Sequence, residues 1–259
     1  MPDRALTPRP WVLGETTWAQ VGAERLDVAV LPWGATEAHN RHLPYATDTI
    51  EATAAAVEAA GRAWSAGTKV IVLPAVPFGV NTGQLDIPLC LNMNPSTQAA
   101  VLRDLVQTIE RAHIRRLVIM NGHGGNDFRQ MIRELQPSTD VFLCTVNWYA
   151  CVDAAAYFDQ PGDHAGELET SVMLHLAPEL VRPLHEAGPG AARAFRVRGL
   201  REGWAWAPRW WTAVTDDTGV GNPAGATDEK GRRFFESAAS RLAEFLAELA
   251  RTDPDAMYG

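Results

Sequence analysis

The chain has 259 residues, of which 46% are hydrophobic and 21% are charged, a composition typical of a globular protein with a substantial core. Its formal net charge of -8 argues against a surface for nucleic acid or for an anionic membrane, because such surfaces concentrate Lys and Arg. A small polar molecule is the expected partner. The three cysteines, Cys90, Cys144 and Cys151, show no CxxC spacing, which argues against a thiolate zinc site and against a disulfide framework.

Neither a membrane span nor a secretion signal is predicted. The sequence contains no apolar run of membrane-spanning length, and its first residues, MPDRALTPRPW, lack an apolar core. We therefore expect a cytoplasmic protein. Because α/β folds of this length commonly run undivided, residues 1–259 are predicted to form a single domain.

Strand-like and helix-like patterns alternate along the chain. Short, mainly apolar and β-branched runs predict four strands, at 25–33, 69–74, 116–121 and 140–147. Helical patterns lie between and after them, at about 48–65, 95–112, 126–135, 166–176 and 227–249. This alternation predicts an α/β fold with a mainly parallel sheet and helices on both sides.

One segment, 188–225, fits neither pattern. It is rich in Gly and Pro and carries four of the nine tryptophans, which are Trp204, Trp206, Trp210 and Trp211. Three interpretations of this segment are possible: a hairpin, a lid or a subunit contact.

The first group of potential metal ligands follows the first predicted strand, in the sequence GATEAHNRHLPYATD. Glu37 and His39 are two residues apart, so an extended backbone would point both side chains to one side and present two ligands together. Asp48 stands at the start of a predicted helix. There the alternative to a ligand role is that Asp48 or Thr47 caps the helix, with Glu51 completing a capping box if Asp48 is the cap.

The second group is NGHGGN, residues 121–126, directly after a predicted strand. The carboxyl ends of strands in an open parallel sheet are where ligands bind, which places His123 where chemistry is expected. Asn126 at the end of the motif is a candidate substrate contact. A phosphate-binding loop is the alternative, but the spacing matches neither GxGxxG nor GxxxxGK[ST].

The third group is HAGELETS, which contains His164, Glu167 and Glu169. On a helix, Glu169 would share a side with the apolar residues Val172 and Met173, whereas Glu167 would lie on a more polar side. A carboxylate on a buried side requires a cation or hydrogen-bond donors. Glu169 is therefore the better metal ligand. Glu167 is either a catalytic residue or a helix residue that is solvated or lies next to the ligands.

A lone histidine is more often a hydrogen-bonded core or loop residue than a metal ligand. Three groups at the ends of predicted strands and helices make separate structural roles for all of them a weaker explanation. Structural roles are predicted for the remaining histidines, which are His42, His113, His175 and His185.

The charges of the three groups favour a pair of metal ions. Glu37, Asp48 and Glu169 in one pocket would raise one another's pKa values unless cations compensate them. Two divalent ions bring four positive charges against three carboxylates and leave room for one hydroxide, with Asp48 bridging ions roughly 3.5 to 4 Å apart. His39 and His123 would each give a nitrogen ligand to one ion, a donor set that suits Zn, Mn or Fe.

Together these motifs resemble the creatininase (creatinine amidohydrolase) family. The match rests on Glu37-x-His39 with Asp48 in HLPYATD, on NGHGGN and on HAGELETS, in the order of the family. The resemblance implies a three-layer α/β/α sandwich and a dinuclear metal amidohydrolase, commonly a hexamer. It also implies that Glu37, His39, Asp48 and His123 are metal ligands, and that His164 handles protons.

Two departures point to a branch of this family other than creatininase itself. Creatininase carries a Glu at the position of Gly125, so the missing carboxylate is expected to come from Glu169. The segment NTGQLDIP, with the neighbouring LNMNPST, resembles members thought to act on cyclic polyol ketones. Its side chains Asn81, Gln84 and Asp86 are candidate contacts for a hydroxyl-rich substrate, and a polar loop that bonds its own backbone is the alternative.

Trp148, after the fourth predicted strand, is a candidate aromatic wall of the substrate site or a residue at the edge of the core. The leading hypothesis for function is the opening of a cyclic amide, or of a similarly activated ring, by a hydroxide that bridges two metal ions. An alternative is hydrolytic cleavage of a carbon-carbon bond in an inosose-type ketone. The third hypothesis is a non-catalytic subunit that is stabilised by metal.

Overall fold

The computed structural model describes residues 8–160 and 162–259. Its sheet has four parallel strands in the order β2-β1-β3-β4. The strands are β1 (Val28–Trp33), β2 (Val70–Val72), β3 (Arg116–Asn121) and β4 (Phe142–Asn147). Trp33 pairs with Asn121, and Asn121 pairs with Asn147, so β1, β3 and β4 end level at one edge of the sheet.

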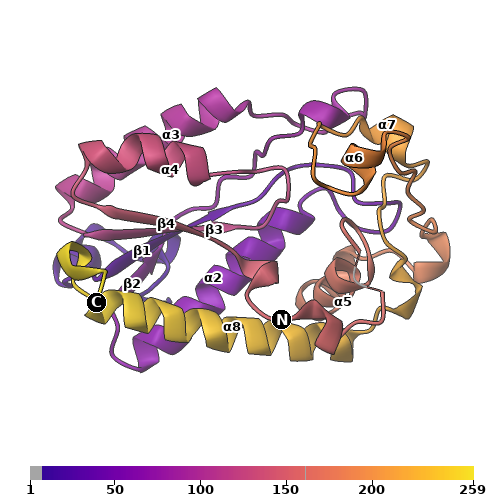
Figure 1. Ribbon diagram of the computed structural model, residues 1–259. Coiled ribbons are helices and arrows are strands. Elements are labelled where there is room, and N and C mark those ends of the chain that lie inside the picture. The colour runs from indigo at the N-terminus through magenta and orange to yellow at the C-terminus, as the bar shows by residue number, and fades with distance from the viewer. Residues whose placement is uncertain (1–7, 161) are drawn as a thin grey trace.

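Helices cover both faces of this sheet (Figure 1). On one face, α2 (Thr47–Ser65) and α8 (Asp228–Arg251) pack on alternate strand residues such as Val30 and Met120. On the other face, α3 (Pro95–Arg111) and α4 (Arg129–Leu135) cover the intervening strand residues. Alternate residues of a strand point to opposite faces, so apolar runs without alternation produce a sheet that is buried on both sides. The predicted three-layer α/β/α sandwich is confirmed.

Further helices lie beyond the sheet. α5 (Glu167–Leu176) packs against α8 and α2. The shorter helices are α1 (Trp18–Gly22), α6 (Arg198–Arg201) and α7 (Trp211–Val214). α5, α6 and α7 lie on the side of the molecule away from the C-terminus (Figure 1). Over the described ranges, every helix is too short or too polar to cross a membrane.

Candidate metal centre

Six side chains from the three predicted groups converge near the carboxyl edge of the sheet. They are Glu37, His39, Asp48, His123, His164 and Glu169. β1 leads into the loop that carries Glu37 and His39, β3 leads into His123, and α2 and α5 contribute the two remaining carboxylates. Glu169 is half-buried, and none of the other five is more than 6% exposed. The fold therefore brings together residues up to 132 positions apart in the sequence and removes them from water.

Three overlapping sets of these side chains could hold a metal ion. In each set, one nitrogen or oxygen per residue lies within 4.8 Å of the others. The sets are Glu37, Asp48 and His123; His39, Asp48 and Glu169; and Glu37, His39 and His164. Asp48 belongs to the first two sets, with Oδ1 near His39 and Oδ2 near His123.

Each of the three histidines is oriented by a backbone carbonyl. The distances are 3.1 Å from His39 Nδ1 to Glu37 O, 3.1 Å from His123 Nε2 to Val80 O, and 2.8 Å from His164 Nε2 to Ala38 O. A carbonyl oxygen only accepts, so the nitrogen that faces it carries the proton. In a neutral imidazole the other nitrogen then directs a lone pair into the cluster, as metal-ligating histidines do.

The inward nitrogens face carboxylate oxygens. His39 Nε2 lies 2.9 Å from Asp48 Oδ1, and His123 Nδ1 lies 2.8 Å from Glu37 Oε1 and 3.1 Å from Asp48 Oδ2. Glu37 Oε1 and Asp48 Oδ2 are buried and have no hydrogen-bond partner among the residues described. A lone pair opposite a buried carboxylate oxygen is repulsive, so this arrangement requires either a proton or a cation between the two atoms.

Without metal, the cluster holds protons tightly. Burial lowers the pKa of His39, but the carboxylates of Asp48, Glu169 and Glu37 together outweigh burial and raise the pKa from 6.5 to about 10. Burial also lowers the pKa of His123, which Glu37 and Asp48 nevertheless raise well above its usual value. Burial raises the pKa of Glu169 against the opposing effect of His39. These shifts show a site that is short of positive charge.

The capping alternative for Asp48 is wrong. Helix α2 begins at Thr47, its N-cap is Ala46, and no side chain caps it. Asp48 instead lies within the first turn and directs its carboxylate to the histidines. Glu51 completes no capping box. It is 2% exposed, its Oε1 lacks a described partner, and burial, followed by Glu169 and Asp48, raises its pKa well above the usual value.

The structure brings Glu169 to the cluster, as the helical pattern favoured, but gives Glu167 a different environment from the expected one. Glu167 is only 1% exposed, because α8 packs on α5 and brings Lys230 to its carboxylate. The second oxygen of Glu167 accepts the backbone N–H of Gln160 at 2.8 Å. The expectation of a solvated Glu167 is therefore wrong, and both of its oxygens are bonded outside the cluster. Glu169 lies in the cluster, and its Oε2 accepts the backbone N–H of Ala165.

The segment that was expected to contact substrate is bonded to the protein itself. Asn81 is buried and donates through Nδ2 to the backbone oxygens of Thr36 and Leu91. Gln84 is also buried and donates through Nε2 to Glu37 Oε2. Asp86 is exposed and accepts the Thr212 hydroxyl at 2.5 Å. These contacts favour the alternative of a polar loop that satisfies its own surroundings.

Asn126 and Trp148 are likewise occupied elsewhere. Asn126 Oδ1 accepts the backbone N–H of Val80 at 3.0 Å and Nε2 of Gln98 at 2.8 Å, which holds the NGHGGN loop in place. Trp148 is fully buried and packs against Phe234 and Phe235 in the core between the sheet and α8. Its position gives no support to a role as an aromatic wall.

Two aromatic side chains that the sequence did not single out as site residues lie near the cluster. The hydroxyl of Tyr149 lies 4.0 Å from the place where a Cβ on Gly124 would be. Burial, together with nearby carboxylates that include Glu169, raises the pKa of Tyr149 to about 12. Trp211 packs edge-on against His164, with ring centroids 5.2 Å apart. The four tryptophans of the unassigned segment were a signal for Trp211, whereas Tyr149 had none beyond its place after a strand.

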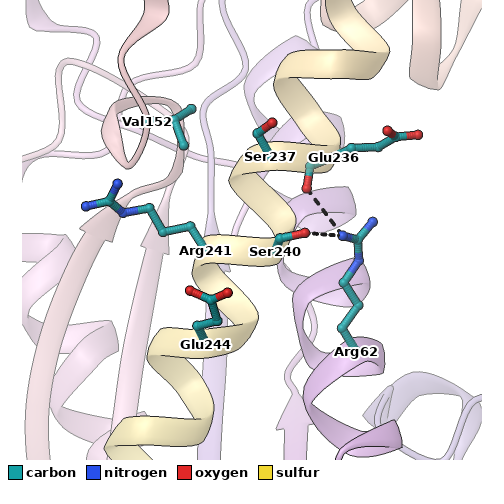
Figure 2. A pocket seen from close by; sticks show the side chains of 7 residues that line it. All are labelled: Arg62, Val152, Glu236, Ser237, Ser240, Arg241 and Glu244. Atoms are coloured by element: carbon teal, nitrogen blue, oxygen red, sulfur yellow. Dashed lines mark hydrogen bonds between the residues drawn. The ribbon is translucent and has the colours of Figure 1, made fainter.

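A surface groove elsewhere on the molecule does not belong to this centre. It has a volume of about 610 Å³ and lies between α2, α8 and the segment that follows β4 (Figure 2). Arg62 Nη1 donates to the backbone oxygen of Glu236 at 3.3 Å and to Ser240 Oγ at 2.5 Å. None of the residues that line the groove belongs to the cluster, and the charged residues among them include both acids and bases.

Comparison with known proteins agrees with the geometry. The family described as creatininase, creatinine amidohydrolase, matches residues 14–246. The mycofactocin precursor peptide peptidase of Mycobacterium ulcerans (strain Agy99) is 31% identical to the chain, over 93% of this chain and 92% of its own length. A Bacteroides fragilis NCTC 9343 structure, provisionally described as a creatinine amidohydrolase, is 43% identical and superposes with a TM-score of 0.92, covering 98% of this chain and 100% of its own.

Creatininase itself shares the fold at lower identity. Its Mn form is 24% identical and superposes with a TM-score of 0.76, covering 94% of this chain and 100% of that chain. A mutant in a Zn-Zn form gives the same TM-score. The chain belongs to the creatininase family and is a metal-dependent hydrolase.

Proposed function

We propose that the chain is a dinuclear metal hydrolase that cleaves an amide bond. Glu37, Asp48 and His123 would hold one divalent ion, and His39, Asp48 and Glu169 would hold the other. The observation that carries the proposal is the orientation of the histidines, each fixed by an N–H to a backbone carbonyl with its other nitrogen turned toward carboxylates.

The residues fit a pair of divalent ions. Imidazole nitrogens and carboxylate oxygens suit Zn, Mn or Fe, and the unpartnered oxygens Glu37 Oε1 and Asp48 Oδ2 offer two buried acceptors. The three carboxylates would balance most of the charge of two divalent ions. When bound, such ions lower the pKa of water toward neutrality and polarise a carbonyl group.

His164 is proposed to move the proton that amide cleavage requires. Its Nε2–H is held by Ala38 O at 2.8 Å, so a neutral ring directs the lone pair of Nδ1 into the cluster, 3.7 Å from Glu37 Oε1. The edge-on contact with Trp211 fixes the plane of the ring. An imidazole in this position can take a proton at Nδ1 and pass it to a leaving nitrogen.

An amide is favoured over a ketone as the substrate. The described activities of the relatives, an amidohydrolase and a peptidase, both break carbon-nitrogen bonds of amides. The ketone alternative depended on Asn81, Gln84 and Asp86 as contacts for hydroxyl groups, and the side chains of all three are bonded within the protein. We therefore propose a cyclic amide or a short peptide as the substrate class.

Metal content and a substrate panel together test this function. Purified protein is stripped of metal, reconstituted with Zn²⁺ or Mn²⁺, and assayed on cyclic amides, short peptides and inosose-type ketones. We expect up to two ions per chain and turnover of at least one amide. His164→Ala should keep the ions and lose turnover, whereas His185→Ala, at an exposed position, should keep both. Failure to bind metal after reconstitution, or turnover of ketones alone, would contradict the proposal.

Three further expectations stay predictions. They are a single domain over residues 1–259, a hexameric assembly and a cytoplasmic location. Sedimentation of the purified protein measures the assembly directly, and a species of one or two chains at assay concentrations would contradict the hexamer.

A further inference from the structure

Gln84 lies directly behind one oxygen of the proposed ligand Glu37. It ends the short 3₁₀ turn Thr82–Gln84 and is 5% exposed. Its Nε2 donates to Glu37 Oε2, while Glu37 Oε1 points the other way, 2.8 Å from His123 Nδ1, and has no hydrogen-bond partner among the described residues. The amide thus occupies one carboxylate oxygen and leaves the other free for a cation.

Cys90 determines which end of the Gln84 amide faces the carboxylate. Its Sγ donates to Gln84 Oε1 at 3.2 Å and accepts the backbone N–H of Ala38 at 3.2 Å. An amide turned the other way would place its oxygen against the carboxylate, which repels it, and would place its NH₂ group against the S–H donor. Burial raises the pKa of the Cys90 thiol, which keeps the thiol proton available for donation.

These bonds form a closed ring around one ligand. Glu37 is bonded to Gln84, Gln84 to Cys90, and Cys90 to Ala38, which is the next residue after Glu37 in the chain. The ring therefore ties the backbone and the carboxylate of the same ligand to two buried side chains of one loop. Because the amide and the thiol are neutral, they orient the carboxylate without competing with a cation for its charge.

We propose that Gln84 and Cys90 are positioning residues, which fix the Glu37 carboxylate so that Oε1 would be the oxygen available to hold a metal ion. The inference rests on the metal centre proposed above, and it replaces the substrate contact that the sequence suggested for Gln84. Outer partners of metal ligands typically change metal affinity about 10-fold to 100-fold when they are removed.

Metal binding to the stripped protein tests the proposal without any substrate. Zn²⁺ is titrated against a chromophoric chelator for the parent and for the variants Gln84→Met, Cys90→Ala and Cys90→Ser. Gln84→Met keeps the size of the side chain and removes the amide, so one of the two ions should bind about 10-fold to 100-fold more weakly. Cys90→Ala should weaken the same ion about threefold to tenfold, and Cys90→Ser, which keeps a donor, should recover most of that loss.

Cys151→Ser is the matched control, because Cys151 contacts α8 and no member of the cluster. If the parent binds two ions and both Gln84→Met and Cys90→Ala bind them with parental affinity, the positioning role is overturned. A parent that binds no ion would instead contradict the metal centre itself. If circular dichroism shows that Gln84→Met is unfolded, the comparison of Cys90→Ala with Cys90→Ser decides, and equal affinities in that pair overturn the proposal.

Discussion

Replacing Asp48 by Asn removes one charge from the shared position of the proposed centre and leaves the shape of the side chain unchanged. Asp48 is 2% exposed, with Oδ1 2.9 Å from His39 Nε2 and Oδ2 3.1 Å from His123 Nδ1. It is the one acid common to the set with Glu37 and His123 and the set with His39 and Glu169. Asp48→Asn is therefore expected to weaken the binding of both proposed ions.

The size of the effect follows from the charge. An ion pair about 4 Å apart contributes about 4 kcal/mol at an effective dielectric constant of about 20. Because about 1.4 kcal/mol corresponds to a factor of ten, losing one such pair weakens the binding of one ion about 10³-fold. The amide nitrogen of Asn also cannot bind a metal as the second carboxylate oxygen does. We expect Asp48→Asn to retain at most one ion and to lose at least about 10³-fold in turnover.

The assay is elemental analysis of the reconstituted protein together with turnover of the best amide substrate. Asp104→Asn is the matched control, because Asp104 is an exposed residue of α3, and it should keep the metal content and turnover of the parent. Circular dichroism verifies that both variants are folded. Two tightly bound ions and parental turnover in Asp48→Asn would refute the bridging role and the charge argument behind it.

Three other perturbations test separate features. Gly125→Ala should weaken metal binding about 100-fold, because the added Cβ would lie 2.4 Å from His123 Nε2. Gly124→Ala is the control: its Cβ would have only a tyrosine hydroxyl 4.0 Å away, so it should bind metal like the parent in the same titration. Metal affinity should rise about tenfold per pH unit for each proton displaced, measured from pH 7 to 9, because His39 holds its proton up to a pKa of about 10 in the metal-free protein. Because its pKa is raised, protonated His39 also stabilises the folded metal-free protein. This contribution is complete below pH 6.5 and is lost as the pH rises through about 10. Denaturant unfolding over this pH range would detect the loss. Lys230→Met leaves the buried carboxylate of Glu167 without its cation and should lower the thermal midpoint by a few degrees, with the metal content unchanged. A loss of metal would show instead that this ion pair acts on the centre.

The sequence predicted the layers of the fold and the family well, because both depend on local patterns. Apolar runs without alternation predicted strands that are covered on both faces, and three motifs at strand or helix ends predicted a family that the comparisons confirm. Helix boundaries were less accurate at functional loops. The helix predicted from 126 begins at Arg129, and the side chain of Asn126 is bonded to Asn121 in the preceding loop and to Val80.

Predictions failed where the answer depended on a partner far away in the chain. The pattern of the ten residues of α5 could not show that α8 would cover the side of Glu167 and bring Lys230 to it. Gln84 is separated from Glu37 by 47 residues, so nothing in the loop sequence indicated that the amide would bind a ligand rather than a substrate. Trp148 turned into the core because the first turn after β4 leaves it facing α8.

The tautomers of the three histidines connect the fold to the need for cations. Each imidazole donates one N–H to a backbone carbonyl, either in the loop that follows β1 or in the neighbouring loop that contains Val80. The backbone therefore determines which nitrogen faces inward. The same folding step buries Glu37, Asp48 and Glu51 with Glu169 beside them, and the imidazoles can balance these acids only by taking a second proton. Binding of divalent ions exchanges such protons for charges that do not leave the site as the pH rises. A fold that fixes the orientation of each imidazole in advance therefore prepares its inward nitrogen for positive charge, either a proton or a metal ion.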